Sequence, residues 1–212
     1  MVGNRFDITL IAKDNGFPAL ETFFIVEIIV MDINDEIPSI SVLSSISSID
    51  ENLRGNILNF HSDDPDTNSD LTFELKCSCQ KLGNFTPCSN LAILEDWIKI
   101  TGEFDFEKVQ EVNCSLKISD LNGESDQSNQ ILFDFEINDV NDNIPSFDSD
   151  FYNFSVLENI QPGQIIGSVH AIDQDEKDEI LYSIDENDHL TIDQAGNLRI
   201  TYSFDFEGGY QK

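Results

Sequence analysis

The sequence repeats a seven-residue acidic segment, and this repetition constrains the fold more than any other feature. The segment reads Asp-Ile-Asn-Asp-Glu-Ile-Pro at 32–38 and Asp-Val-Asn-Asp-Asn-Ile-Pro at 139–145. The two copies are 107 positions apart, as are the two Glu-Asn pairs that begin at Glu51 and Glu158. Several motifs that recur at one spacing indicate tandem repeats. We therefore expect structural units of about 107 residues, joined by these acidic segments.

Two further motifs recur in the same order. Phe-Asp-Phe-Glu stands at 104–107 and again at 204–207, and an Asp-x-Asp pair stands at 64–66 and at 173–175. A single short motif of this kind has little specificity, whereas an ordered set at one approximate period indicates a shared architecture.

The residues around each acidic segment predict β-strands. Apolar and polar residues alternate over 131–137 and again over 152–156, which is the pattern of a strand with one buried face. Pro145 cannot donate to a sheet and favours an extended residue before it, so it ends the preceding strand. A short connector rich in oxygen atoms is suited to a hard cation such as calcium.

Composition excludes several classes of protein. The chain has 41 acidic and 11 basic residues and a net charge of −30, so it offers no basic surface for nucleic acid. Disorder is disfavoured because 40% of the residues are hydrophobic and alternate regularly. We see no signal peptide, and no apolar run approaches the roughly 18 residues of a membrane-spanning helix. We expect a fragment of a larger exported protein whose membrane anchor lies outside it.

The ordered motifs, together with Ala-Lys-Asp-Asn-Gly at 12–16, resemble extracellular cadherin repeats, of a protocadherin or another non-classical type. The resemblance covers nearly the whole chain. It implies an all-β fold of tandem seven-stranded Greek-key β-sandwiches, one complete and two truncated. Residues 1–38 would be the end of one repeat plus a linker, 39–145 a complete repeat plus a linker, and 146–212 the beginning of a third. In the complete repeat we expect strands at 39–42, 46–49, 56–62, 71–77, 91–100, 112–119 and 130–138.

All four cysteines fall in the complete repeat, and their even number in an exported module predicts two disulfides. A bridge between Cys77 and Cys79 would be strained. The strands that contain residues 77 and 112 should be antiparallel neighbours, so either Cys77 or Cys79 pairs with Cys114 and the other pairs with Cys88. Free buried thiols are the alternative. Trp97, the only tryptophan, is expected in the core.

The resemblance also implies calcium sites at the junctions between repeats. Calcium takes about six to eight oxygen ligands, which is more than one strand can supply. An EF-hand is excluded because neither Asp-x-Asp region is followed by the glycine and the glutamate that an EF-hand requires. Because Asp63 directly precedes Asp64, the alignment of the first Asp-x-Asp pair with the second could be shifted by one residue. At the second junction the ligands carried over are Glu51, Asp105, Glu107, the Val140 carbonyl, Asn141, Asp142, the Asn143 carbonyl, Asp173 and Asp175. At the first junction they are Asn34, Asp35, Asp64, Asp66 and Asp120.

The function implied is calcium-dependent, homophilic cell–cell adhesion at the extracellular side of the plasma membrane. Calcium would stiffen the junctions, and other cadherin ectodomains, homophilic or heterophilic, would be the partners. A non-adhesive spacer and a signalling receptor built from the same modules are alternatives. Paired carboxylates such as Asp105 and Glu107 could serve a glycosidase. An enzyme is disfavoured because the carboxylates recur repeat by repeat and no unique cleft signature accompanies them.

Overall fold

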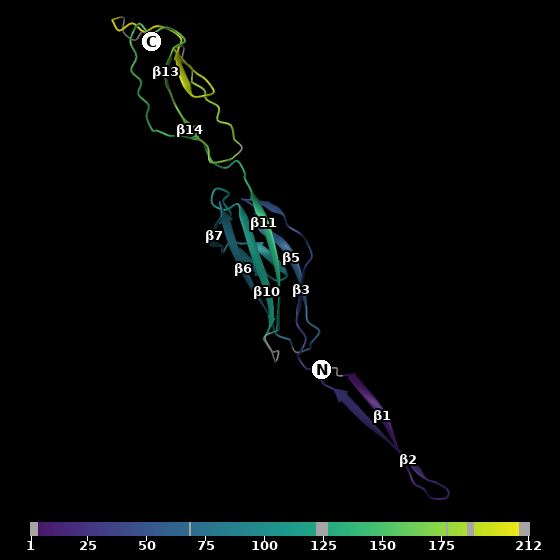
Figure 1. Cartoon of the computed structure of the whole chain (residues 1–212). Helices are drawn as coiled ribbons and strands as arrows, with labels where there is room; N and C mark the ends of the chain where they lie inside the picture. Colours follow the sequence, from purple (N-terminus) through teal and green to yellow (C-terminus); the bar gives the residue numbers. More distant parts are fainter. Residues whose placement is uncertain (1–3, 68, 122–126, 177, 186–188, 208–212) are drawn as a thin grey trace. The chain divides into compact units, whose positions relative to one another are not determined.

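The computed structural model describes residues 4–67, 69–121, 127–176, 178–185 and 189–207, and every regular element in these ranges is a β-strand. The chain divides into two compact units, Met1–Ile137 and Asn138–Lys212. The expected all-β fold is confirmed (Figure 1). In the described part of the chain, no helix is long and apolar enough to cross a membrane.

The first unit begins with an antiparallel hairpin. Strand β1 (Asn4–Lys13) pairs along its whole length with β2 (Glu21–Val30). The turn between them is organised by Asp14, whose carboxylate accepts the backbone N–H groups of Gly16 and Leu20 at 3.1 and 2.8 Å. A small polar side chain that accepts backbone N–H groups in this way fixes a turn.

The rest of the first unit is a sandwich of two sheets (Figure 1). One sheet has the order β4-β11-β10-β6-β7, and the other has the order β3-β5-β9-β8. The first contains β4 (Ser48–Asp50), β6 (Leu71–Lys81), β7 (Asn84–Pro87), β10 (Glu111–Asp120) and β11 (Gln127–Asn138). The second contains β3 (Ser39–Val42), β5 (Gly55–Asp63), β8 (Leu91–Leu94) and β9 (Trp97–Ile100).

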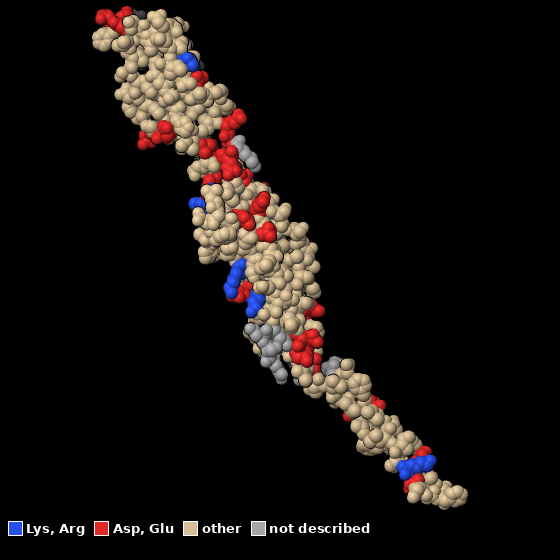
Figure 2. Space-filling model, in the orientation of Figure 1, with Lys and Arg blue, Asp and Glu red and all other residues tan. Residues whose placement is uncertain are grey.

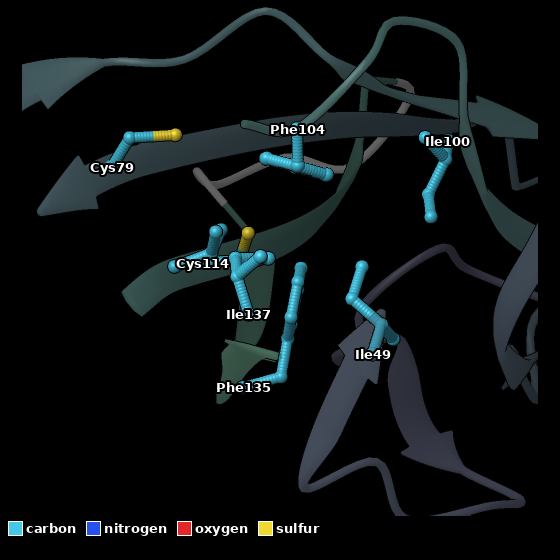
Figure 3. Close-up of a cluster of buried hydrophobic side chains, with 8 residues drawn as sticks. Ile49, Cys79, Ile100, Phe104, Cys114, Phe135 and Ile137 are labelled. Carbon is cyan, nitrogen blue, oxygen red and sulfur yellow. The ribbon is translucent and has the colours of Figure 1, made fainter. Parts of the chain in front are cut away.

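The core of this sandwich comes from the alternating residues of both sheets. In β10, Val112, Cys114, Leu116 and Ile118 are buried. Figure 3 shows one of the two core clusters, in which Phe104 and Phe135 pack edge to face with ring centroids 6.0 Å apart. Such a pair adds about 0.5–1.5 kcal/mol to the hydrophobic stabilisation of the two rings. Phe104 thereby anchors the loop that follows it.

The sandwich has nine described strands where seven were expected. Strand β6 continues to Lys81 and turns back as β7, because Leu82 and Gly83 both have positive φ angles and form a tight turn. The expected strand at 91–100 is divided into β8 and β9 by a turn at Glu95, which also has a positive φ angle.

Trp97 is not a core residue, contrary to expectation. It precedes Ile98, which is fully buried, so the alternation of β9 directs Trp97 to the outer face of the sheet. It is 37% exposed and lies opposite Leu94 on β8.

The second unit reproduces the pairing of the four-stranded sheet. Its strands are β12 (Ser146–Phe147), β13 (Ile165–Ser168), β14 (Ala171–Ile172), β15 (Leu190–Ile192) and β16 (Asn197–Ile200). Strand β12 pairs with β14 as β3 pairs with the end of β5, and β13-β16-β15 repeats β5-β9-β8. The repetition in sequence is therefore also a repetition in structure.

The strand predicted at 152–156 is wrong, because residues 151–157 form no strand. The corresponding strand of the first unit, β4, pairs with β11. Among the described residues of the second unit no strand plays the part of β11, so the alternating segment has no partner to pair with.

The two disulfides resolve the alternatives left by the sequence. Cys77 is bonded to Cys114, its direct neighbour across the β6–β10 pairing, and Cys79 is bonded to Cys88. The second bond closes the β6–β7 hairpin. None of the four cysteines is free.

Replacement of Cys88 tests this connectivity. We expect the Cys88→Ser variant to show one alkylated cysteine without reductant, and fragmentation should locate the label at Cys79. In the matched Cys114→Ser variant the label should move to Cys77. A label on Cys77 in the first variant would mean that the two bonds are exchanged.

Candidate metal centre

A glutamate at the end of β4 holds the loop between β9 and β10. The buried carboxylate of Glu51 accepts the backbone N–H of Phe106 at 2.7 Å, and Phe106 lies between Asp105 and Glu107. In the second unit, Glu158 accepts the N–H of Phe206 at 3.0 Å. The Glu-Asn and Phe-Asp-Phe-Glu motifs therefore act as a pair, in which one motif fixes the backbone of the other.

This arrangement gathers negative charge. Carboxylate oxygens of Glu51 and Glu107 lie within 4.8 Å of each other. Lys108 donates to Oδ2 of Asp105, which raises the pKa of Lys108, while the buried Oδ1 of Asp105 accepts no hydrogen bond from the described residues. Like charges at this separation repel, and a bound cation would offset the repulsion.

The first acidic segment is bound to the loop after β5. Asp32 accepts the backbone N–H and the hydroxyl of Thr67, both at 2.7 Å, and these bonds lower the pKa of Asp32 below its ordinary 3.8. Asp66 accepts the N–H of Glu36 at 2.8 Å and donates its own N–H to Asp64 at 2.9 Å.

The second acidic segment repeats three of these four bonds within the second unit, namely those donated by backbone N–H groups. Asp139 accepts the N–H of Glu176 at 2.9 Å, and Asp175 accepts the N–H of Asn143 at 3.2 Å. Asp175 in turn donates its N–H to Asp173 at 3.2 Å. Because the bonds match one by one, Asp64 and Asp66 correspond to Asp173 and Asp175. The alternative alignment through Asp63 is thus excluded.

Asp120 also binds the first linker. Its two oxygens accept the side-chain N–H of Asn34 at 2.6 Å and the N–H of Asp70 at 2.9 Å. Asn34 Oδ1 and Asp64 Oδ2 are buried, and neither accepts a hydrogen bond from the described residues. A buried carboxylate oxygen without a donor is costly unless a cation or an ordered water binds it.

The predicted residues thus lie in separate groups. Asn34, Asp64, Asp66 and Asp120 surround the first linker, whereas Asp35 is exposed in that linker. Glu51, Asp105 and Glu107 meet in the first unit. In the second unit Asn143 also donates its side-chain N–H to Asp142 at 3.1 Å and to Asp175 at 2.8 Å, and Val140 is half-buried.

Asp178 was missed by the sequence analysis. One of its carboxylate oxygens lies within 4.8 Å of those of Asp173 and Asp175, and it accepts the side-chain N–H of Asn141. Its distance of three residues from the Asp-x-Asp pair was the available signal. It enlarges the group that could bind a cation.

These groups present the oxygen ligands that calcium prefers, namely carboxylates, amide oxygens and backbone carbonyls. The donor set fits a hard cation, which could bind the buried oxygens of Asn34 and Asp64. On the face drawn in Figure 2, lysine and arginine are few and scattered while acidic residues are frequent. That distribution fits a cation and does not fit nucleic acid.

Comparisons with known proteins agree with these observations. No family model matches the chain. The chain is 24% identical over 196 residues to Cadherin-3 of Caenorhabditis elegans, covering 92% of the chain and 6% of that protein. It is 26% identical over 219 residues to human Protocadherin gamma-C4, covering 96% of the chain and 23% of that protein. The chain therefore spans less than a quarter of either relative.

Solved cadherin ectodomains share the fold. Mouse Protocadherin-24 EC1-3 aligns with a TM-score of 0.72 at 24% identity, covering 96% of the chain and 68% of that structure. Protocadherin Gamma B2 extracellular cadherin domains 1-5 align with a TM-score of 0.70 at 22% identity, covering 95% of the chain and 40% of that structure.

The bond between Thr67 and Asp32 predicts a titration. We expect Thr67→Val to raise the pKa of Asp32 toward 3.8, because one of its two hydrogen bonds is lost. Since the pKa of Asp32 is depressed, its stabilising effect exists above about pH 3.8 and is lost as the pH falls through the folded pKa. NMR titration of the Asp32 carboxyl carbon measures this. Thr72→Val, which removes a bond to a carbonyl instead, should leave that pKa unchanged.

Proposed function

We propose that this chain, which resembles cadherins and protocadherins in sequence and cadherin ectodomains in fold, is part of a calcium-dependent adhesive ectodomain. Calcium would bind where one repeat meets the next and would make the junction stiff. Adhesion would be homophilic, through ectodomains of the whole protein at the extracellular side of the plasma membrane.

One observation carries the calcium proposal: buried oxygens with no hydrogen-bond donor lie among acidic groups of matching geometry in both linkers. Asn34 Oδ1 and Asp64 Oδ2 lie in the group that contains Asp66 and Asp120. A second oxygen of each acidic side chain is already bound to the backbone, so the loop shape does not depend on the cation alone. Asn34 Oδ1 and Asp64 Oδ2 are the oxygens left for a ligand, and the acidic surroundings favour a positive one.

Each group of residues has a separate task in this proposal. Glu51 fixes the loop that carries Asp105 and Glu107, and Asp175 fixes the backbone of the second linker. The residues that would hold calcium are those carried over from the family pattern, with Asp178 as an addition. Calcium supplies positive charge that these oxygens share, and it thereby favours the arrangement in which they are close.

We also infer that the chain has no catalytic role. Asp105 and Glu107 recur as Asp205 and Glu207, and in both copies the residue between them is held by a glutamate. Carboxylates that recur in this way serve a structural unit of each repeat. An acid–base pair is usually recognised as one pair of carboxyl groups whose different environments separate their pKa values.

Calcium should stabilise the chain, and Asp142 should be required for part of that effect. For calcium tenfold above its dissociation constant, each site adds about 1.4 kcal/mol. In a protein of this size that is a rise of roughly 3–6 °C in melting temperature. We expect this rise, measured by calorimetry in calcium and in chelator, to be reduced in Asp142→Asn.

The control is Asp134→Asn, which removes the same charge from the exposed outer face of β11. It should retain the wild-type response to calcium. If the wild-type chain has the same melting temperature in calcium and in chelator, the linkers do not bind calcium and the proposal fails.

Adhesion needs a separate test with the complete ectodomain. Beads coated with it should aggregate in millimolar calcium and disperse in chelator, since extracellular calcium sites have dissociation constants of about 10⁻⁴–10⁻³ M. Beads that carry an unrelated ectodomain should stay apart. Dispersed beads together with an intact thermal response to calcium would favour a non-adhesive spacer.

A further inference from the structure

We propose that the β6–β7 hairpin braces the loop that carries Asp105 and Glu107, with Lys81 as the positioning residue. This inference rests on the proposed calcium function and adds what keeps one ligand loop ready for the cation. The hairpin lies in a segment, 80–90, that the repeat motifs do not explain.

The ammonium group of Lys81 binds backbone carbonyl groups of the loop that carries Asp105 and Glu107. Lys81 is half-buried and ends β6, and its ammonium group donates to the carbonyl oxygen of Glu107 and, at 3.4 Å, to that of Phe106. The ammonium nitrogen also lies 6.0 Å from the centre of the Phe106 ring, within reach of a cation–π interaction.

Phe106 is therefore held on both sides. Its N–H group is bound by the carboxylate of Glu51 at 2.7 Å, and its carbonyl is bound by Lys81. The side chains of Asp105 and Glu107 leave the backbone directly before and after this residue. When the two peptide groups are fixed, the directions of both carboxylates are restricted.

The hairpin explains why Lys81 is in place. Lys81 lies opposite Asn84, and the turn between them has φ angles of 50° at Leu82 and 80° at Gly83. The Cys79–Cys88 bond joins β6, two residues before Lys81, to the residue that follows β7. A cross-linked hairpin has few alternative conformations, so its last residues are a firm support.

The bonds of Lys81 to carbonyl oxygens order the loop without occupying a carboxylate. The positive charge also offsets part of the repulsion between Glu51 and Glu107, whose oxygens lie within 4.8 Å. A cation could then bind to carboxylates that are already oriented. Preorganisation of this kind raises affinity because less order is lost on binding.

The second unit offers an internal comparison. Its loop at 204–207 has the matching bond between Glu158 and Phe206. Residues 178–196, which precede β16, contain no lysine or arginine, and Lys177 and Arg199 stand outside this stretch. The loop of the first unit is thus braced by a cationic side chain that this stretch of the second unit does not offer.

Hydrogen exchange in chelator tests the brace in the whole 212-residue chain. We expect Lys81→Met to speed exchange of the amides at 104–110 about tenfold, because hydrogen bonds to a charged donor are lost. Lys81→Arg, which keeps the charge and the donors, should restore most of the protection. Lys76→Met removes an exposed lysine from the same strand and should leave the loop unchanged. Unchanged exchange in Lys81→Met would overturn the proposal.

Calcium titration provides a second measure. At about 0.5 M salt the Debye length is near 4 Å, so the through-space repulsion between Lys81 and calcium is screened. We expect Lys81→Met to weaken calcium binding severalfold at that salt, with Lys76→Met unchanged. Tighter binding in Lys81→Met would show that Lys81 only opposes the cation, and would overturn the brace. If wild type itself fails to bind calcium, the proposed function fails, while the exchange result still decides whether the loop is braced.

Discussion

The loops of this chain depend on carboxylates that accept backbone N–H groups. Glu51 binds the N–H of Phe106, Asp66 that of Glu36, and Asp175 that of Asn143. A charged acceptor makes a stronger bond than a neutral one, and such a bond fixes a loop that has no regular pairing of its own. It also brings carboxylates together at the edge of the core, where their charges repel. The same interaction that shapes the loops therefore creates negative charge that a bound cation would offset.

The core and the loops are stabilised by different forces, and this separation explains how the chain carries a net charge of −30. The sandwich core is apolar, with Phe104 and Phe135 in edge-to-face contact and a disulfide between neighbouring strands. Its stability comes from burial, which does not depend on ionic conditions in the same way. The acidic groups lie in linkers and loops. We therefore infer that cation binding changes the loops and the linkers more than the core.

The sequence predicted the fold class and most strands because alternation and repetition are local signals. The recurring motifs also led to Asn34, Asp64, Asp66 and Asp120, which the structure places together at the first linker, and their role as calcium ligands stays a prediction. The division of 91–100 and the β6–β7 hairpin were missed because they depend on positive φ angles at Glu95 and Leu82, residue types that rarely adopt them. Trp97 was wrongly expected in the core because the first residue of a strand does not by itself show which face of the sheet it occupies. Asp178 and Lys81 act through contacts between segments distant in sequence, which no motif records.

The two linkers, although equivalent, hold their first aspartate differently. Asp32 accepts two bonds from Thr67, one from the backbone and one from the hydroxyl, and both favour its charged form. Asp139 accepts the backbone N–H of Glu176, whose side chain brings another negative charge to the same loop. A neutral hydroxyl in one copy is thus replaced by a carboxylate in the other. At this position the loop that binds the second linker therefore carries one more acidic side chain than the loop that binds the first. If the proposed calcium function holds, we expect the two junctions to differ in how strongly their order depends on calcium.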